Sequence, residues 1–129
     1  MEENEKWAAY WYQKAAEQGV AKAQFSLGFC HDQGKGLKKS CFQALQWYEK
    51  AANKGLQAAY YPVGQSYLSG KGTRKDEVLA FRWFQKGALS GNVKCMTSLA
   101  TCYHYGKGVN KDYEEATKWY ESAAKEGDS

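Results

Sequence analysis

The segment Trp47-Tyr48-Glu49-Lys50-Ala51-Ala52 decides the fold, because it recurs three more times at a constant spacing of 36 residues. Each copy holds an aromatic pair, two polar residues and two small residues. A fixed period of this length is typical of proteins built from stacked structural repeats. The other copies are Trp11-Tyr12-Gln13-Lys14-Ala15-Ala16, Trp83-Phe84-Gln85-Lys86-Gly87-Ala88 and Trp119-Tyr120-Glu121-Ser122-Ala123-Ala124.

Each copy is bracketed by signals for the two ends of a helix. A helix N-cap residue stands seven residues before the tryptophan of each copy, and a small residue stands three residues before it. A glycine that could adopt a left-handed conformation comes three residues after the copy. These signals predict a helix of about 14 residues in every unit. The caps are Asn4, Ser40, Asp76 and Asp112, the small residues are Ala8, Ala44, Ala80 and Ala116, and the glycines are Gly19, Gly55, Gly91 and Gly127.

A second helix is predicted in the other half of each unit. A small residue, an aliphatic residue and a ring-bearing residue follow one another in steps of four, which is helical periodicity. A Gly-Lys-Gly sequence then ends the pattern. A helix hairpin of this kind cannot bury its apolar face alone and must stack on its neighbours. The three stripes are Ala23/Leu27/His31, Ala59/Val63/Tyr67 and Cys95/Leu99/Tyr103, followed by glycine pairs at 34–36, 70–72 and 106–108.

The two patterns together, clearest over residues 95–127, resemble the Sel1-like repeat, a relative of the tetratricopeptide repeat. The resemblance implies an all-α fold, an α-solenoid of about seven helices in stacked antiparallel hairpins, with a right-handed superhelix and a concave groove. The local departures are His31 in place of tyrosine, Ala100 in place of glycine and Ser40-Cys41 in place of Asp-Tyr. Pro62 is expected to shorten or kink the start of its helix.

The predicted domain organisation is a single repeat domain over residues 1–129. Residues 1–19 form the second helix of an incomplete repeat. Three repeats follow, at 20–55, 56–91 and 92–127.

Charge and motif content argue against several function classes. The net charge of +4 is spread over scattered lysines, and Arg74 and Arg82 are the only arginines, so nucleic acid is not an expected partner. Gly-Lys-Gly lacks the Ser/Thr and the preceding strand of a phosphate-binding loop, and is interpreted as a turn. No metal-ligand spacing and no catalytic constellation is recognised, including at His31. We therefore expect a protein that is not an enzyme and needs no metal or cofactor.

Hydropathy and cysteine spacing limit the cellular environments that we expect for the chain. The mean hydropathy is −0.74 and the longest apolar stretch is 8–12, so no transmembrane segment is predicted. On one helix, Cys95 and Cys102 are too far apart to form a disulfide, whereas a Cys30–Cys41 bridge stays open. The absence of a secretory signal and of a regular disulfide framework favours an intracellular setting.

The candidate binding residues lie on the first helix of each hairpin, opposite the inward stripe, and the resemblance places that face on the concave surface. Several are apolar where a pure scaffold would prefer polar residues, which is typical of partner sites. The Trp-Tyr pairs, including Trp47, Tyr48, Trp83 and Phe84, are assigned to the core between repeats. The predicted site comprises Lys22, Phe25, Phe29, Tyr61, Gln65, Leu68, Lys94, Thr101, His104 and Tyr105.

Two functions follow from this reading. The first is a non-catalytic adaptor or scaffold that binds a peptide or partner helix of another protein, with Lys22 and Lys94 contacting carboxylates. The alternative is a structural segment of a longer solenoid, or a scaffold that self-associates through uncapped terminal helices bearing Trp7 and Trp11. For Phe25 and Phe29 a purely structural role, packing against the preceding helix, also stays open.

Overall fold

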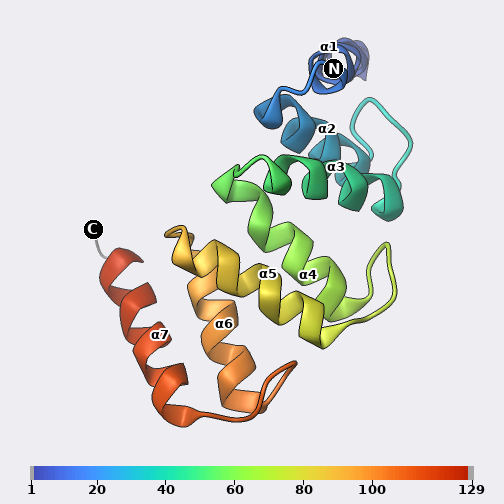
Figure 1. Cartoon of the computed structure of the whole chain (residues 1–129). Coiled ribbons are helices and arrows are strands. Elements are labelled where there is room, and N and C mark those ends of the chain that lie inside the picture. The colour runs from blue at the N-terminus through green and yellow to red at the C-terminus, as the bar shows by residue number, and fades with distance from the viewer. Residues whose placement is uncertain (1, 128–129) are drawn as a thin grey trace.

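The computed structural model describes residues 2–127, and all regular secondary structure in this range is helical (Figure 1). The predicted all-α fold of about seven helices is confirmed. Between α3 and α4 lies a short 3-10 helix, η1 (Gln57–Ala59). The α-helices are α1 (Glu2–Glu17), α2 (Ala21–Gln33), α3 (Cys41–Asn53), α4 (Tyr60–Ser69), α5 (Glu77–Leu89), α6 (Val93–Tyr105) and α7 (Tyr113–Gly127).

The helices pack in chain order as stacked hairpins. Helix α2 pairs with α3, α4 with α5 and α6 with α7, while α1 packs against α2 at the N-terminal end of the stack. Successive hairpins meet through the α3–α4 and α5–α6 contacts. We refer below to α2, α4 and α6 as first helices and to α1, α3, α5 and α7 as second helices. The right-handed superhelix and the concave groove that the resemblance implies remain predictions.

Three of the four predicted N-caps hold the start of a second helix. The Ser40 hydroxyl accepts a hydrogen bond from the Gln43 amide at 3.1 Å, and the Asp76 carboxylate accepts one from the Leu79 amide at 3.0 Å. Asp112 does the same for Glu115 at 3.1 Å. The prediction is wrong at Asn4, because α1 already begins at Glu2 and Asn4 therefore lies inside the helix.

The predicted left-handed glycines are confirmed in the inner repeats. Gly19, Gly55 and Gly91 have φ angles of 90°, 89° and 97°, and each lies two residues beyond a helix end. Gly127 differs, because it is the last residue of α7 and does not have a positive φ.

The Gly-Lys-Gly sequences are turns, as interpreted. Gly34, the first glycine of its pair, caps α2 in a left-handed conformation and its amide donates to the Cys30 carbonyl. Gly36, the second, lies against the backbone of Glu5, where any Cβ would collide. The later pairs repeat this arrangement, with Gly72 against Cys41 and Gly108 against Glu77. The glycines therefore let each turn touch the second helix of the preceding unit.

Pro62 has the predicted effect on its helix. The chain first makes the 3-10 turn η1, and α4 then runs for only 10 residues, against 13 in α2 and α6. Pro62 lies in the first turn of α4, where its missing amide hydrogen costs no helical hydrogen bond.

The core confirms the assignment of the aromatic pairs for the inner repeats and contradicts it at the N-terminal end. Phe84 is fully buried and Trp83 is 8% exposed. Trp11, at the same position in the first unit, is 61% exposed, and Tyr12 is 38% exposed. The prediction that Trp11 packs between repeats is wrong, because α1 has no first helix beside it in the described chain.

Candidate functional site

A pocket of about 560 Å³ collects candidate residues from all three first helices. Four predicted site residues meet here, Phe25 and Phe29 from α2, Tyr61 from α4 and Lys94 from α6. Residues separated by up to 69 positions in the chain therefore share one surface. We call this the central pocket; it is lined by Phe25, Phe29, Asp32, Tyr48, Gln57, Ala58, Tyr61, Pro62, Gly91, Asn92, Val93 and Lys94.

A smaller hollow of about 270 Å³ adjoins the central pocket along α4. The two share Asp32, Tyr48, Tyr61 and Pro62, so they form one continuous surface. Gln65, a fifth predicted site residue, lies here. The adjoining hollow is lined by Asp32, Tyr48, Tyr61, Pro62, Gln65, Ser66, Ser69 and Lys71.

Aromatic rings in the walls of the central pocket are braced by the core. The Phe25 ring packs on Tyr48 of α3, with 5.4 Å between centroids, and the Tyr61 ring packs on the buried Phe84 at 6.2 Å. Phe25 is thus partly structural, although its partner is the following helix. Phe29 is 43% exposed and presents its ring to solvent. The pocket combines fixed aromatic walls with one accessible ring.

The turn between α5 and α6 is tied to η1 at the other side of the pocket. The Gln57 side chain donates to the Ser90 carbonyl at 2.6 Å, and the Asn92 side-chain amide donates to the Gln57 carbonyl at 2.9 Å. The Asn92 side-chain oxygen also accepts from the Cys95 amide at 3.1 Å and so caps α6. These bonds fix the position from which Lys94 projects.

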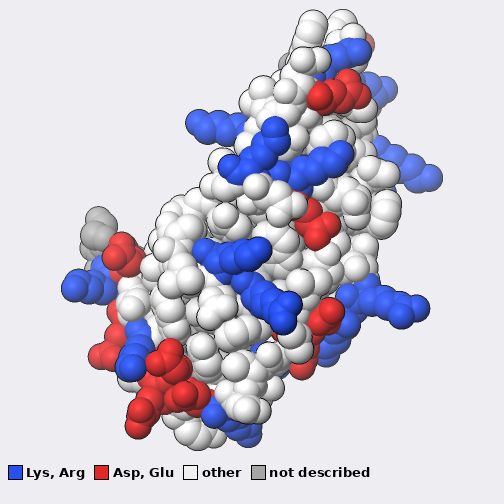
Figure 2. Space-filling view, viewed as in Figure 1, with Lys and Arg blue, Asp and Glu red and all other residues white. Residues whose placement is uncertain are grey.

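Lysines supply the positive charge around the central pocket. The Lys94 ammonium lies 5.5 Å from the Tyr61 ring centroid, within range of a cation–π contact. Lys71 forms an ion pair with Asp32 at 3.4 Å. Burial, reinforced by the negative charge of Asp32, raises the pKa of Tyr48 far above its usual value, so its phenol stays neutral. On the face shown in Figure 2, acidic side chains gather over α7, and lysines and arginines dominate elsewhere.

The structure does not bring every predicted residue to this pocket. Lys22 is exposed on α2 but lies outside the pocket lining. Leu68 packs against the core cluster that joins α5, α6 and α7. The Thr101 hydroxyl donates to the Thr97 carbonyl at 2.9 Å and lies 3.2 Å from the Tyr120 hydroxyl.

The remaining two predicted residues belong to a separate aromatic cluster at the C-terminal end. The His104 ring lies 4.5 Å from Tyr105, 5.5 Å from Tyr113 and 6.5 Å from Tyr120, measured between centroids. These contacts join the end of α6 to α7. The predicted site residues therefore do not form one surface: five line the central pocket and the adjoining hollow, and the others lie elsewhere.

Sequence reasoning missed some of the pocket's walls. Tyr48 was assigned to the core alone, yet it lines the pocket while being only 5% exposed. Pro62, Gln57 and Asn92 also line it. Asn92 carried a readable signal, because an asparagine directly before a helical stripe is a strong N-cap.

Metal ligands, cysteines and membrane-spanning potential were also considered for the residues that the structure describes. Across residues 2–127 no group of three or more His, Cys, Asp or Glu side chains is placed to hold a metal ion. All four cysteines are free, and the Cys30–Cys41 bridge is not formed. None of the helices in the described chain has the length and apolar character required to cross a membrane.

Sequential helix hairpins at a period of 36 residues define an α-helical repeat protein. The chain belongs to the Sel1 repeat family: the family's model matches residues 2–20, 21–56, 57–92 and 93–128. Together the four matches cover nearly the whole sequence.

Solved structures of other proteins have the same fold. A Sel1 repeat protein from Oxalobacter formigenes is 37% identical with a TM-score of 0.90, over 95% of this chain and 50% of that one. The protective antigen c5321 of uropathogenic Escherichia coli, with an SLR fold, is 38% identical with a TM-score of 0.88, over 91% and 25%. Helicobacter pylori cysteine rich protein B is 24% identical with a TM-score of 0.76, over 98% and 91%, and shows the fold alone.

The chain thus spans half the length of the first of these structures and a quarter of the second. A search of curated proteins gave no significant match.

Proposed function

We propose that this chain is a non-catalytic adaptor or scaffold module that binds a peptide or helix of another protein in the central pocket. The observation that carries the proposal is the convergence of Phe25, Phe29, Tyr61 and Lys94 from three successive repeats on one hollow. Membership of the Sel1 repeat family supports protein interaction as the general role.

The pocket favours a ligand that carries apolar and acidic groups together. Phe29 and Tyr61 offer ring surface to an apolar side chain, and aromatic anchors of this type contribute much of the binding energy at protein interfaces. Lys94 is an exposed residue that lines the same pocket, where a carboxylate can pair with its ammonium group. An Asp or Glu placed a few residues from a large apolar residue is the expected motif.

Selection from a random peptide library tests the proposal without a known partner. Peptides enriched on the wild-type chain are expected to combine acidic and large apolar residues. Their affinity should fall at least about tenfold on a Phe29→Ala/Tyr61→Ala/Lys94→Glu variant, because two ring contacts and a charge are lost.

A matched control uses Phe42→Ala, since Phe42 is 58% exposed and lies outside the pocket lining. This variant should retain full affinity, and circular dichroism should show unchanged helicity in both variants. Equal binding by the triple variant and the wild type would contradict the site.

A second function, self-association or stacking into a longer solenoid, is favoured by the exposed rings of α1. Trp7 is 62% exposed, Tyr10 is 48% exposed and Trp11, on the same helix, is 61% exposed. Light scattering over a concentration series tests it. A mass that rises with concentration and is restored to the monomer value by Trp7→Ser/Trp11→Ser would support self-association; a constant monomer mass would exclude it.

A further inference from the structure

The lysines that look scattered along the sequence are gathered by the fold in the loops of the helix hairpins. The loops that join first to second helices cover residues 34–40, 70–76 and 106–112. They hold eight of the 18 basic residues and two of the 14 acidic ones, so their net charge is +6, against +4 for the whole chain. The basic residues are Lys35, Lys38, Lys39, Lys71, Arg74, Lys75, Lys107 and Lys111.

The first two of these loops lie on the same side of the stack. Figure 1 shows the α2–α3 and α4–α5 loops at the right of the view, and in Figure 2 Lys and Arg side chains project from that side. The second glycines of these loops, Gly36 and Gly72, lie against the backbone of the preceding second helix. The backbone that carries these lysines is therefore held in a fixed position.

An exposed apolar side chain lies between the first two loops. Phe42 is 58% exposed and belongs to the first turn of α3, directly after the α2–α3 loop. The α4–α5 loop reaches the same point, since a Cβ atom at Gly72 would lie 3.1 Å from the Phe42 amide nitrogen. A large apolar ring thus has a basic loop on each side. Val78, 36 residues later and 52% exposed, repeats this position between the second and third loops.

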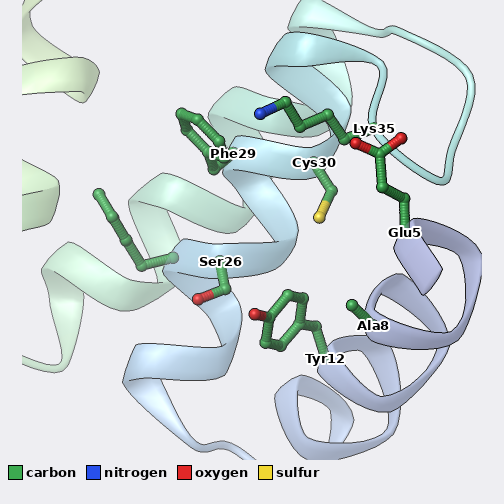
Figure 3. A pocket seen from close by; sticks show the side chains of 8 residues that line it. Glu5, Ala8, Tyr12, Ser26, Phe29, Cys30 and Lys35 are labelled. Carbon is green, nitrogen blue, oxygen red and sulfur yellow. The ribbon is translucent and has the colours of Figure 1, made fainter. Parts of the chain in front are cut away.

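Two of the loop lysines are already engaged by α2. Lys35 extends across the end of α2 toward the Phe29 ring, and its ammonium lies 5.5 Å from the ring centroid (Figure 3). Lys71 pairs with the Asp32 carboxylate at 3.4 Å. These lysines belong to the contacts between helices rather than to the exposed end of the hairpins.

Three other cations in the loops beside Phe42 are available to a partner. Lys38, Lys39 and Arg74 are exposed, and their charged groups enter none of the ion pairs or cation–π contacts within residues 2–127. We call the surface formed by Lys38, Lys39, Phe42 and Arg74 the basic edge.

Free cations around an exposed apolar side chain match the chemistry of an anionic membrane surface. Lipid head groups present negative charge without a fixed geometry, which flexible lysines can follow, and an apolar side chain can enter the boundary between head groups and acyl chains. Nucleic acids favour arginine and rings that stack on bases. The basic edge has one arginine, and Val78 replaces the ring one repeat later. The residue types therefore favour a membrane.

We propose that the basic edge is a docking surface for an anionic membrane. The Phe42 ring enters the head-group region, and Lys38, Lys39 and Arg74 pair with lipid phosphates. None of these four residues lines the central pocket, so the inference does not rest on the proposed peptide binding.

Co-sedimentation of the full chain with lipid vesicles tests the proposal. In about 0.1 M salt the protein should bind vesicles made of equal parts phosphatidylglycerol and phosphatidylcholine, and should not bind vesicles of phosphatidylcholine alone. Binding should be lost in about 1 M salt, where the Debye length falls to about 3 Å.

A pair of charge variants locates the contact. Lys38→Glu/Lys39→Glu/Arg74→Glu should lower the vesicle partition coefficient at least about a hundredfold, because each cation near an anionic surface contributes roughly fivefold. The control makes the same change in net charge. It should lower the coefficient less than about fivefold, because a helix of this size spans about 20 Å, or two Debye lengths. The control substitutes glutamate where first helices begin and where α7 ends, away from the loops, at Lys22, Lys94 and Lys125.

The apolar contact distinguishes a membrane from a soluble polyanion. Phe42→Ser should lower vesicle binding about tenfold, because the ring no longer leaves water on docking. Phe29→Ala/Tyr61→Ala, which impairs the central pocket without changing the net charge, should bind vesicles like the wild type. Circular dichroism should show unchanged helicity in every variant.

Several results would overturn the membrane assignment. These are no binding to anionic vesicles, equal losses in the two charge variants, wild-type binding by Phe42→Ser, or loss of binding in the central-pocket variant. Tighter binding to a DNA duplex or to poly-glutamate than to vesicles would also overturn it, and would assign the basic edge to a soluble polyanion.

Discussion

Tyr12 and Phe84 occupy the same position of the repeat, yet their environments differ completely. Phe84 is fully buried between α4 and its neighbours, and Tyr12 is 38% exposed on α1. Trp83 and Trp11, one residue earlier, repeat the contrast at 8% and 61%. The same local sequence thus builds a core in the middle of the array and an open surface at its end. What differs is the neighbouring helix, because an aromatic side chain is buried only when another element covers it.

The largest difference in stability is expected between variants that lack the Phe84 ring and variants that lack the Tyr12 ring. Phe84→Ala should lower the free energy of unfolding by about 3–5 kcal/mol, since it empties a packed site. Tyr12→Ala should cost less than about 1 kcal/mol, because its ring is already partly in water. Urea unfolding followed by circular dichroism measures both. Equal losses would show that α1 is as well packed as α5.

The next effect comes from the close approach between Gly64 and Phe84. Gly64→Ala should destabilise the protein by about 1–3 kcal/mol, because the added methyl group overlaps the ring. In a Phe84→Leu background the same substitution should be neutral or stabilising, since alanine is the better helix former. A double-mutant cycle measured by urea unfolding gives the coupling. Additive effects would contradict a direct clash.

Burial in the inner repeats should also set a dependence of stability on pH. Desolvation raises the pKa of Cys95 to about 12, whereas an unfolded thiol ionises at about 8.5. A raised native pKa leaves stability intact below pH 8.5 and lowers it as the pH rises toward 12, by up to about 1.4 kcal/mol per pH unit.

Cys95→Ala should flatten this fall, and alanine already fills the equivalent positions 23 and 59. The comparison is the slope of unfolding free energy against pH for the two proteins between pH 8.5 and 11. Identical slopes would refute the contribution of Cys95.

The smallest effect distinguishes helix starts in the two regions. Asp76→Ala should cost about 1 kcal/mol, because it removes the bond to the Leu79 amide at the start of α5. Asn4→Ala should change stability by no more than about 0.5 kcal/mol, since Asn4 lies inside α1 and caps nothing. Thermal unfolding of both variants is the measurement. If Asn4→Ala lowered stability as much as Asp76→Ala, Asn4 would act as a helix cap, which contradicts the structure.

Much of the fold could be predicted because its signals are local. Ser40, Asp76 and Asp112 cap helices through bonds to amides three residues away, and Gly34 and its equivalents end them through their own backbone conformation. Such signals need no knowledge of the rest of the chain. Asn4 shows their limit, because a cap residue caps only when the chain before it leaves the helix.

The candidate site could be predicted only in part. Helical periodicity predicted that Phe25, Phe29 and Tyr61 share the face opposite the inward stripe. In the structure these residues line the central pocket together with Lys94. Periodicity could not show that Phe25 rests on Tyr48, or that His104 joins an aromatic cluster with α7. Those contacts depend on the distances between helices, which no spacing within one helix encodes.

The sequence by itself determined the repeat, its helix boundaries in the inner units and the family. Each of these depends on side-chain size, hydrogen-bonding capacity or backbone freedom at fixed spacings. Only the tertiary structure decided which copies of the repeated aromatic pair are core and which are surface. The reason is that burial is a property of two packed elements. Tyr12 and Phe84 carry the same local pattern, and only the helix beside each one distinguishes them.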